Sequence, residues 1–168
     1  MSRLILITGG QRSGKSAKAE QLALSLSPTP VYVATARIWD DEFRQRVLKH
    51  QARRGPEWTN IEEERHLGSL DLTGRVVLVD CLTLWLTNLY FDCQDVDRAL
   101  SMAKEEFDRM VAHDATYIVV TNEIGLGGVS DNALQRRFTD LQGWMNQHVA
   151  RQADEVLLMV SGIAVKVK

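Results

Sequence analysis

The sequence has 168 residues, of which 45% are hydrophobic and 25% are charged, and this ordinary globular composition excludes an intrinsically disordered chain. Twenty Lys and Arg residues stand against 22 Asp and Glu residues, so the net charge of −2 lacks the basic excess that a general nucleic-acid binder carries. The length predicts a single domain over residues 1–168.

No apolar stretch is long enough to cross a membrane. The longest unbroken one, residues 156–160, falls far short of the roughly 18 residues that a transmembrane helix needs. The apolar stretch at residues 4–7 is also too short for the core of a signal peptide. Cys81 and Cys93 lack the paired spacing of a zinc site and are interpreted as reduced thiols. We therefore expect a cytoplasmic protein without a membrane span.

Apolar runs alternate with helical patterns along the chain. A strand is expected at residues 4–8, then a Gly-rich turn, a helix over 13–26, a strand at 31–35 and a polar helix over 40–53. A strand at 76–79, helices over 82–91 and 96–112, a strand at 117–120, a helix over 132–152 and a strand at 156–160 follow, with an edge strand at 163–167. This alternation predicts an α/β fold with a mostly parallel sheet flanked by helices.

The turn after the first strand carries the clearest chemical signal. Residues 9–16 read GGQRSGKS and match the phosphate-binding pattern G-x-x-x-x-G-K-[ST] completely. Glycines let the backbone wrap a polyphosphate, while the amides and the helix N-terminus supply partial positive charge. In such a loop Lys15 would reach the β- and γ-phosphates, and the Ser16 hydroxyl would bind Mg²⁺.

Two acidic residues follow expected buried strands. Asp80 comes directly after residues 76–79, which places it at the carboxyl edge of the sheet as a second Mg²⁺-organising group. Its alternative role is the N-cap of the helix that begins at Leu82. Glu123, after the strand at 117–120, either orients a nucleophile or water or caps a turn.

His50 is the histidine with a recognisable setting. On a helix it shares a face with Phe43 and Val47 and lies one turn from Arg46. This pattern alone leaves a structural histidine and a catalytic one both open. The residues 121–123, TNE, lack the Lys of the guanine-recognising N/T-K-x-D signature, which argues against a switch GTPase.

Several further segments resemble one family when taken together with the phosphate-binding loop. They are residues 8–16, 33–36 with 40–42, Arg46-Val47 with His50, Trp58 with Glu62, Asp80-Cys81 with 87–89, 120–125 and 160–166. In this order they resemble, nearly end to end, the bifunctional adenosylcobinamide kinase/adenosylcobinamide-phosphate guanylyltransferases of cobalamin biosynthesis. The resemblance implies a P-loop sheet similar to RecA-type cores, and assembly as a homotrimer.

The resemblance also implies two reactions at one nucleotide site. ATP or GTP would phosphorylate adenosylcobinamide, with Lys15 assisting and Mg²⁺ held by Ser16 and Asp80. His50 matches the family's guanylylated histidine, which would take GMP from GTP and pass it to adenosylcobinamide phosphate. Neutral imidazole suits this role because it is nucleophilic near pH 7.

The residues implied to contact the nucleotide fall in five places along the chain. They are Gly9, Gly10, Gln11, Arg12, Ser13, Gly14, Lys15 and Ser16; Ala34, Thr35 and Ala36; Gln51, Ala52, Arg53 and Arg54; Glu62; and Asp80. From the residues alone, Glu62 would be interpreted as one solvated acid within the run Glu62-Glu63-Glu64.

Two other functions remain as alternatives. One is a monofunctional P-loop small-molecule kinase in which His50 is structural. The other is a RecA-like ATPase that binds DNA or a partner protein; the missing basic stripe argues against it, because binding to a phosphate backbone depends on clustered Lys and Arg.

Overall fold

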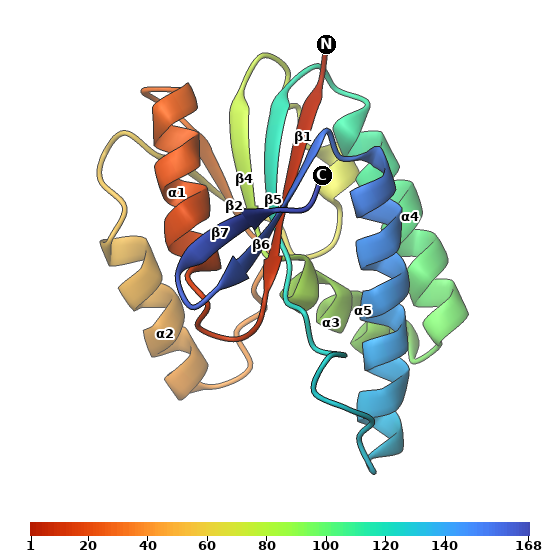
Figure 1. Ribbon diagram of the computed structural model, residues 1–168. Helices are drawn as coiled ribbons and strands as arrows, with labels where there is room; N and C mark the ends of the chain where they lie inside the picture. Colours follow the sequence, from red (N-terminus) through yellow and green to blue (C-terminus); the bar gives the residue numbers. More distant parts are fainter.

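The computed structural model describes residues 1–168 and contains seven strands. They are β1 (Arg3–Gly9), β2 (Val31–Ala34), β3 (Thr59–Glu62), β4 (Val76–Asp80), β5 (Thr116–Val120), β6 (Glu155–Val160) and β7 (Ile163–Lys166). All belong to one sheet in the order β3-β2-β4-β5-β1-β6-β7 (Figure 1). Only the β6–β7 pair is antiparallel. The strands β1 to β6 therefore end at one common edge.

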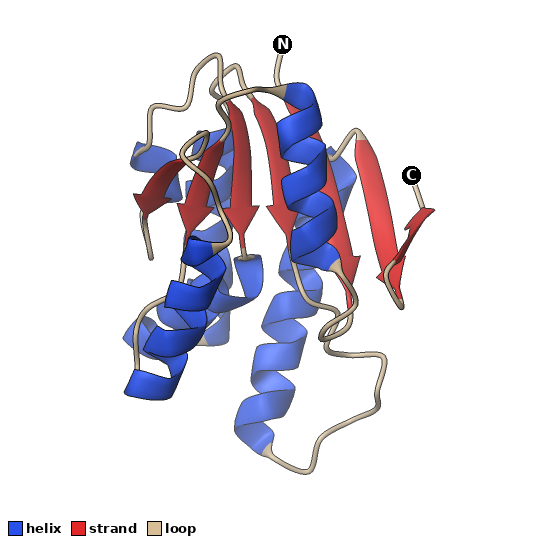
Figure 2. Ribbon diagram, turned by 90° about the vertical axis from the view of Figure 1, so that its left-hand side faces the viewer, coloured by secondary structure: helices blue, strands red, loops and turns tan.

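Five helices accompany the sheet. They are α1 (Lys15–Leu26), α2 (Asp41–Ala52), α3 (Leu82–Cys93), α4 (Val96–Val111) and α5 (Ala133–Gln152), together with a short 3-10 turn at Leu67–Ser69. Helix α1 covers one face of the sheet, and α3, α4 and α5 cover the other (Figure 2). Helix α2 lies beyond the carboxyl edge of the sheet, on the same side as α1. None of the helices is long and apolar enough to span a membrane.

The inner strand β1 is buried on both faces. Leu4 and Leu6 pack into the core beneath α3, α4 and α5, whereas Ile5 and Ile7 pack against α1 on the opposite face. This double burial explains why the inner strands are continuous apolar runs rather than alternating ones. It also fixes the end of β1, from which the phosphate-binding loop starts.

The expected α/β fold with a mostly parallel sheet is confirmed, and so is the edge strand expected at residues 163–167, which the structure places at Ile163–Lys166. The helix expected from residue 13 begins instead at Lys15, because Gly14 has a left-handed φ of 93° and belongs to the loop. Strand β3 was not anticipated. Its sequence, TNIE, is largely exposed at the sheet edge and carries no apolar run, so only its pairing with β2 identifies it.

Candidate active site

The phosphate-binding loop joins the end of β1 to the start of α1. Two of its glycines are required by space: a Cβ on Gly9 would lie 2.7 Å from Ser13 Oγ and 2.8 Å from the Met159 carbonyl oxygen. A Cβ on Gly14 would lie 3.2 Å from the Gly162 Cα, and its positive φ disfavours any other residue. The loop is thus packed against the β6–β7 turn and its backbone course is fixed.

Lys15 is the first residue of α1, and its side chain is buried. Its Nζ donates to the Gly10 carbonyl oxygen at 2.5 Å, so the ammonium spans the loop. Burial lowers the pKa of Lys15, while the neighbouring Cys81 and Asp80 act in the opposite direction. A buried cation inside an amide-lined loop is suited to a polyphosphate.

Ser16 and Asp80 meet although 64 residues separate them in the sequence. The Ser16 hydroxyl donates to Asp80 Oδ2 at 2.9 Å, and the Tyr32 hydroxyl donates to the same oxygen, also at 2.9 Å. Asp80 does not cap α3, whose N-cap is Cys81 without a side-chain cap bond, so the N-cap interpretation of Asp80 is wrong.

This pair fits a hard divalent cation such as Mg²⁺. A hydroxyl and a carboxylate are oxygen ligands, and Mg²⁺ is commonly held by one or two protein groups together with phosphates and water. No group of three or more His, Cys, Asp or Glu residues is arranged to hold a metal. The remaining ligands would therefore have to come from a bound nucleotide and water.

The segment that follows β2 is held by buried polar contacts. The Thr35 hydroxyl donates to the Cys81 carbonyl at 2.7 Å and accepts from the Cys81 amide at 3.0 Å. Asn88 of α3 donates to the carbonyls of Thr35, at 2.8 Å, and of Glu64, at 3.1 Å. The Thr35 hydroxyl thus uses its donor and accepts a hydrogen bond within the protein, where it links the ends of β2 and β4. Burial raises the pKa of Cys81 to about 12, so this thiol is inert.

His50 lies on α2, a helix with no buried residue, and its side chain is exposed. The Arg53 guanidinium donates to His50 Nδ1 at 2.7 Å, since a guanidinium has no acceptor. Arg54 donates to the His50 carbonyl oxygen at 3.1 Å. An exposed ring on an unburied helix is not a packed core histidine, and this weakens the structural reading of His50.

The rest of the segment 51–54 reaches towards the edge strands. Gln51 donates to Glu62 at 3.3 Å, which brings two of the expected nucleotide contacts together across α2 and β3. Arg54 donates to Asn60 Oδ1 at 3.0 Å and lies over the Tyr32 ring, 3.4 Å from its centroid. Arg54 therefore has protein partners on three sides.

The side chains of the remaining residues expected to contact the nucleotide make few interactions within the protein. Gln11 and Arg12 are exposed on the loop, and Arg12 has a φ of 53°. Ser13 Oγ is buried without a partner. No hydrogen bond involves a side chain of Ala34, Ala36 or Ala52, which can contribute only backbone and methyl groups.

Glu123 behaves as a turn cap. Its Oε1 accepts from the amides of Gly125 and Leu126 at 2.6 and 2.9 Å, and its own amide donates to the Gly9 carbonyl at 2.9 Å. The carboxylate thus shapes the loop after β5, and the backbone ties that loop to the start of the phosphate-binding turn.

Two residues near the site carried no sequence signal of function. Tyr32 is hidden in the apolar run of β2, and Glu20 looks like an ordinary helix former in α1. Glu20 Oε1 is buried without a hydrogen-bond partner, and burial raises the pKa of this carboxyl while Arg53 and Arg54 counteract the shift. Only the folded arrangement places these two side chains beside Asp80 and the end of α2.

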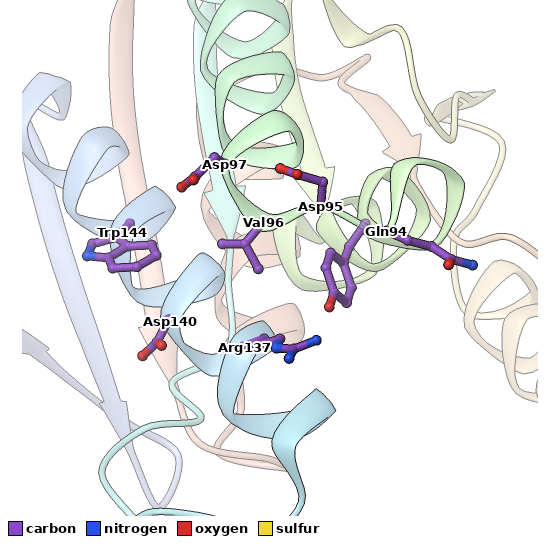
Figure 3. A pocket seen from close by; sticks show the side chains of 8 residues that line it. Gln94, Asp95, Val96, Asp97, Arg137, Asp140 and Trp144 are labelled. Atoms are coloured by element: carbon purple, nitrogen blue, oxygen red, sulfur yellow. The ribbon is translucent and has the colours of Figure 1, made fainter.

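A pocket of about 390 Å³ lies elsewhere, between the start of α4, the end of α3 and α5 (Figure 3). Its lining residues are Tyr90, Gln94, Asp95, Val96, Asp97, Arg137, Asp140 and Trp144. None of them belongs to the expected nucleotide site. The candidate site is instead the open edge where the phosphate-binding loop, Asp80 and α2 face one another.

Solved structures similar to this chain have related folds. An ATPase from the type III secretion system of pathogenic bacteria matches with a TM-score of 0.59 at 11% identity, covering 98% of this chain and 56% of that one. A Pyrococcus horikoshii protein, PH0250, matches with a TM-score of 0.52 at 11% identity, covering 99% of this chain and 86% of that one. At these identities the likeness concerns the fold alone.

The curated relatives are far more similar. The bifunctional adenosylcobalamin biosynthesis proteins CobU of Salmonella typhimurium and of Escherichia coli are each 40% identical, covering 98% of this chain and 99% of theirs. CobP of Pseudomonas aeruginosa, described in the same words, is 40% identical over 97% of this chain and 96% of its own. The family model for cobinamide kinase / cobinamide phosphate guanyltransferase matches residues 5–167. The chain therefore belongs to the cobinamide kinase / cobinamide phosphate guanyltransferase family.

Proposed function

We propose that this chain catalyses both reactions for which its family is named, using one nucleotide site at the carboxyl edge of the sheet. It phosphorylates adenosylcobinamide and then transfers GMP to the product, giving adenosylcobinamide-GDP. The hydrogen bond between Ser16 and Asp80 supports the first activity, because it joins the phosphate-binding loop to the acid of β4. The observation that carries the second is the exposed ring of His50 on α2.

In the kinase reaction, the aminopropanol hydroxyl of adenosylcobinamide attacks the γ-phosphorus of ATP or GTP. A new oxygen–phosphorus bond forms, the bond to the β–γ bridging oxygen breaks, and the hydroxyl proton is lost as the nucleoside diphosphate leaves. Lys15 neutralises charge on the β- and γ-phosphates, and the loop amides hold the chain of phosphates in place. Ser16 and Asp80 would hold Mg²⁺, which would neutralise charge on the phosphates.

In the guanylyl reaction, a ring nitrogen of His50 attacks the α-phosphorus of GTP and pyrophosphate leaves. The phosphate of adenosylcobinamide phosphate then attacks the same phosphorus, the nitrogen–phosphorus bond breaks, and the imidazole is restored. Splitting the transfer in this way replaces one difficult displacement by two easier ones.

The contact between Arg53 and His50 determines which nitrogen is available. Because Arg53 donates to Nδ1, the neutral ring carries its proton on Nε2, and the lone pair of Nδ1 is occupied. For Nε2 to attack, the ring must adopt the other tautomer, which requires Arg53 to leave Nδ1. A triphosphate offers Arg53 a stronger, charged acceptor, so nucleotide binding would itself free the histidine.

We also propose a homotrimer, and place both reactions in the cytosol, where the free thiols Cys81 and Cys93 stay reduced. Helix α2 buries no residue within its own chain, and exposed apolar side chains lie on and beside it. They are Ile38, Trp39, Leu48 and Phe91, each between 40% and 53% exposed. A neighbouring chain would cover these side chains and support the helix that carries His50.

Lys15→Ala should abolish both half-reactions, because the buried ammonium neutralises the same phosphates in each. Phosphorylation is followed as adenosylcobinamide phosphate formed from ATP, and guanylylation as GMP attached to the protein. Lys18→Ala, a half-buried lysine one turn along α1, serves as the control. Near-normal guanylylation of Lys15→Ala would show that GTP binds at a different site.

His50→Ala should continue to phosphorylate adenosylcobinamide while GMP transfer stops, since the loop and the Ser16–Asp80 pair remain intact. Intact-protein mass after incubation with GTP should show one added GMP on the wild type, lost in acid, and none on the variant. His66→Ala, which alters another exposed histidine, should keep both activities. Equal loss of the two activities in His50→Ala, at unchanged thermal stability, would refute the assignment of His50 as the nucleophile. The alternative of a monofunctional small-molecule kinase would then be favoured.

Light scattering of the purified protein should give the mass of three chains of 19.0 kDa. Replacing the exposed apolar pair Trp39 and Phe91, whose rings lie 5.0 Å apart, with serines should shift the mass towards the monomer and slow guanylylation. A stable, fully active monomer of the wild-type chain would contradict the trimer.

A further inference from the structure

Tyr32 occupies the middle of β2 and reaches two parts of the candidate site at once. Its side chain is 5% exposed, and β2 pairs with β3 on one side and β4 on the other. The phenol end and the ring face of this residue have different partners. The hydroxyl contacts Asp80, a proposed metal ligand, and the ring contacts Arg54, which is bonded to the backbone of His50.

The hydroxyl end meets Asp80. It donates to Oδ2 at 2.9 Å, the oxygen that also accepts from Ser16. A phenol carries one O–H donor, and this donor is used in the bond to Asp80. Two donors on one oxygen fix the rotation of the carboxylate and leave Oδ1 of Asp80 without a protein partner.

The ring face meets Arg54. The guanidinium carbon lies 3.4 Å from the ring centroid, and Trp58 contacts the ring nearly edge-on, with its centroid at 6.0 Å and an angle of 82° between the planes. A buried ring that is held on one side and covered by a cation on the other is a fixed platform for that cation.

Arg54 in turn holds the end of α2. It donates to the His50 carbonyl oxygen at 3.1 Å and to Asn60 Oδ1 of β3 at 3.0 Å. Because α2 buries none of its residues, its C-terminal turn is fastened to the sheet by these contacts and by the hydrogen bond from Gln51 to Glu62. The Tyr32 ring provides a buried surface against which the Arg54 guanidinium packs.

We propose that Tyr32 is a positioning residue with two separable functions: its hydroxyl orients Asp80 for the metal-bound nucleotide, and its ring seats Arg54 and thereby the turn of α2 that carries His50. The hydroxyl function serves both reactions. The ring function serves guanylyl transfer alone. The inference rests on the proposed function for its kinetic part, whereas its binding and exchange measurements do not.

The experiment compares Tyr32→Phe, which removes only the hydroxyl, with Tyr32→Leu, which removes the ring as well. Tyr90→Phe, a change of a buried tyrosine in α3 outside the site, is the matched control. Binding of a fluorescent GDP analogue is titrated with Mg²⁺, and hydrogen exchange is measured over residues 41–54. The rates of phosphorylation and guanylylation are then determined for each variant.

Tyr32→Phe should need roughly tenfold more Mg²⁺ for tight nucleotide binding, because a hydrogen bond to a charged group is lost. Its ratio of guanylylation to phosphorylation should equal that of the wild type, and exchange over residues 41–54 should be unchanged. Tyr32→Leu should show the same Mg²⁺ shift, faster exchange at the C-terminal turn of α2, and a ratio reduced roughly fivefold or more. Tyr90→Phe should match the wild type throughout.

Failure of the proposed guanylyl reaction and failure of the proposed roles of Tyr32 would give different results. A wild type that gains no GMP from GTP contradicts the guanylyl reaction, yet the Mg²⁺ titration and the exchange data still test the roles of Tyr32. A guanylylating wild type whose Phe and Leu variants share one ratio and one exchange pattern overturns the ring function. An unshifted Mg²⁺ requirement in Tyr32→Phe overturns the hydroxyl function. If Tyr32→Leu does not fold, as judged by thermal unfolding, Tyr32→Met provides the ring-free comparison.

Discussion

The rest of the site depends on the common edge at which the parallel strands end. Register across the sheet aligns Ala34 with Asp80 and Asp80 with Val120, so segments far apart in sequence finish side by side. The hydrogen bond between Ser16 and Asp80 is the direct product of this alignment. Ligands bind at the carboxyl ends of strands in open α/β sheets because loops and helix N-termini converge there.

The groups that serve the proposed chemistry lie in two parts of the structure, one on the buried sheet and one on helix α2. The phosphate-binding loop and Asp80 rest on strands that are buried on both faces, and in the proposal they hold the nucleotide for both reactions. His50 rests on α2, which lies beyond the carboxyl edge of the sheet (Figure 1) and is held at its C-terminal end by Arg54 and Gln51. A bifunctional enzyme benefits from this division, since the same phosphates can be presented to a bound hydroxyl or to the histidine. Tyr32 contacts both parts.

The sequence was informative wherever the chemistry is local in the chain. The phosphate-binding loop is one continuous motif, Asp80 directly follows an apolar run, and the alternation of runs predicted the fold. The contacts of Tyr32 and Asn88 were not predictable, because each joins residues 24 to 53 positions apart and exists only once the strand order is known. Strand β3 could not be predicted from the sequence either, because this exposed edge strand has no apolar pattern. The helical spacing of His50 left a catalytic and a structural role open, and only the family resemblance implied the catalytic one. Its exposure and its contact with Arg53 required the structure.

The central claim is that one nucleotide site serves both reactions, and a crystal structure with Mg²⁺ and a slowly hydrolysed GTP analogue tests it most directly. The account predicts one nucleotide per chain, with its β- and γ-phosphates on residues 9–16 and with Nε2 of His50 facing the α-phosphorus opposite the departing pyrophosphate. A second nucleotide bound at α2, or an α-phosphorus turned away from His50 with Arg53 still on Nδ1, would contradict it.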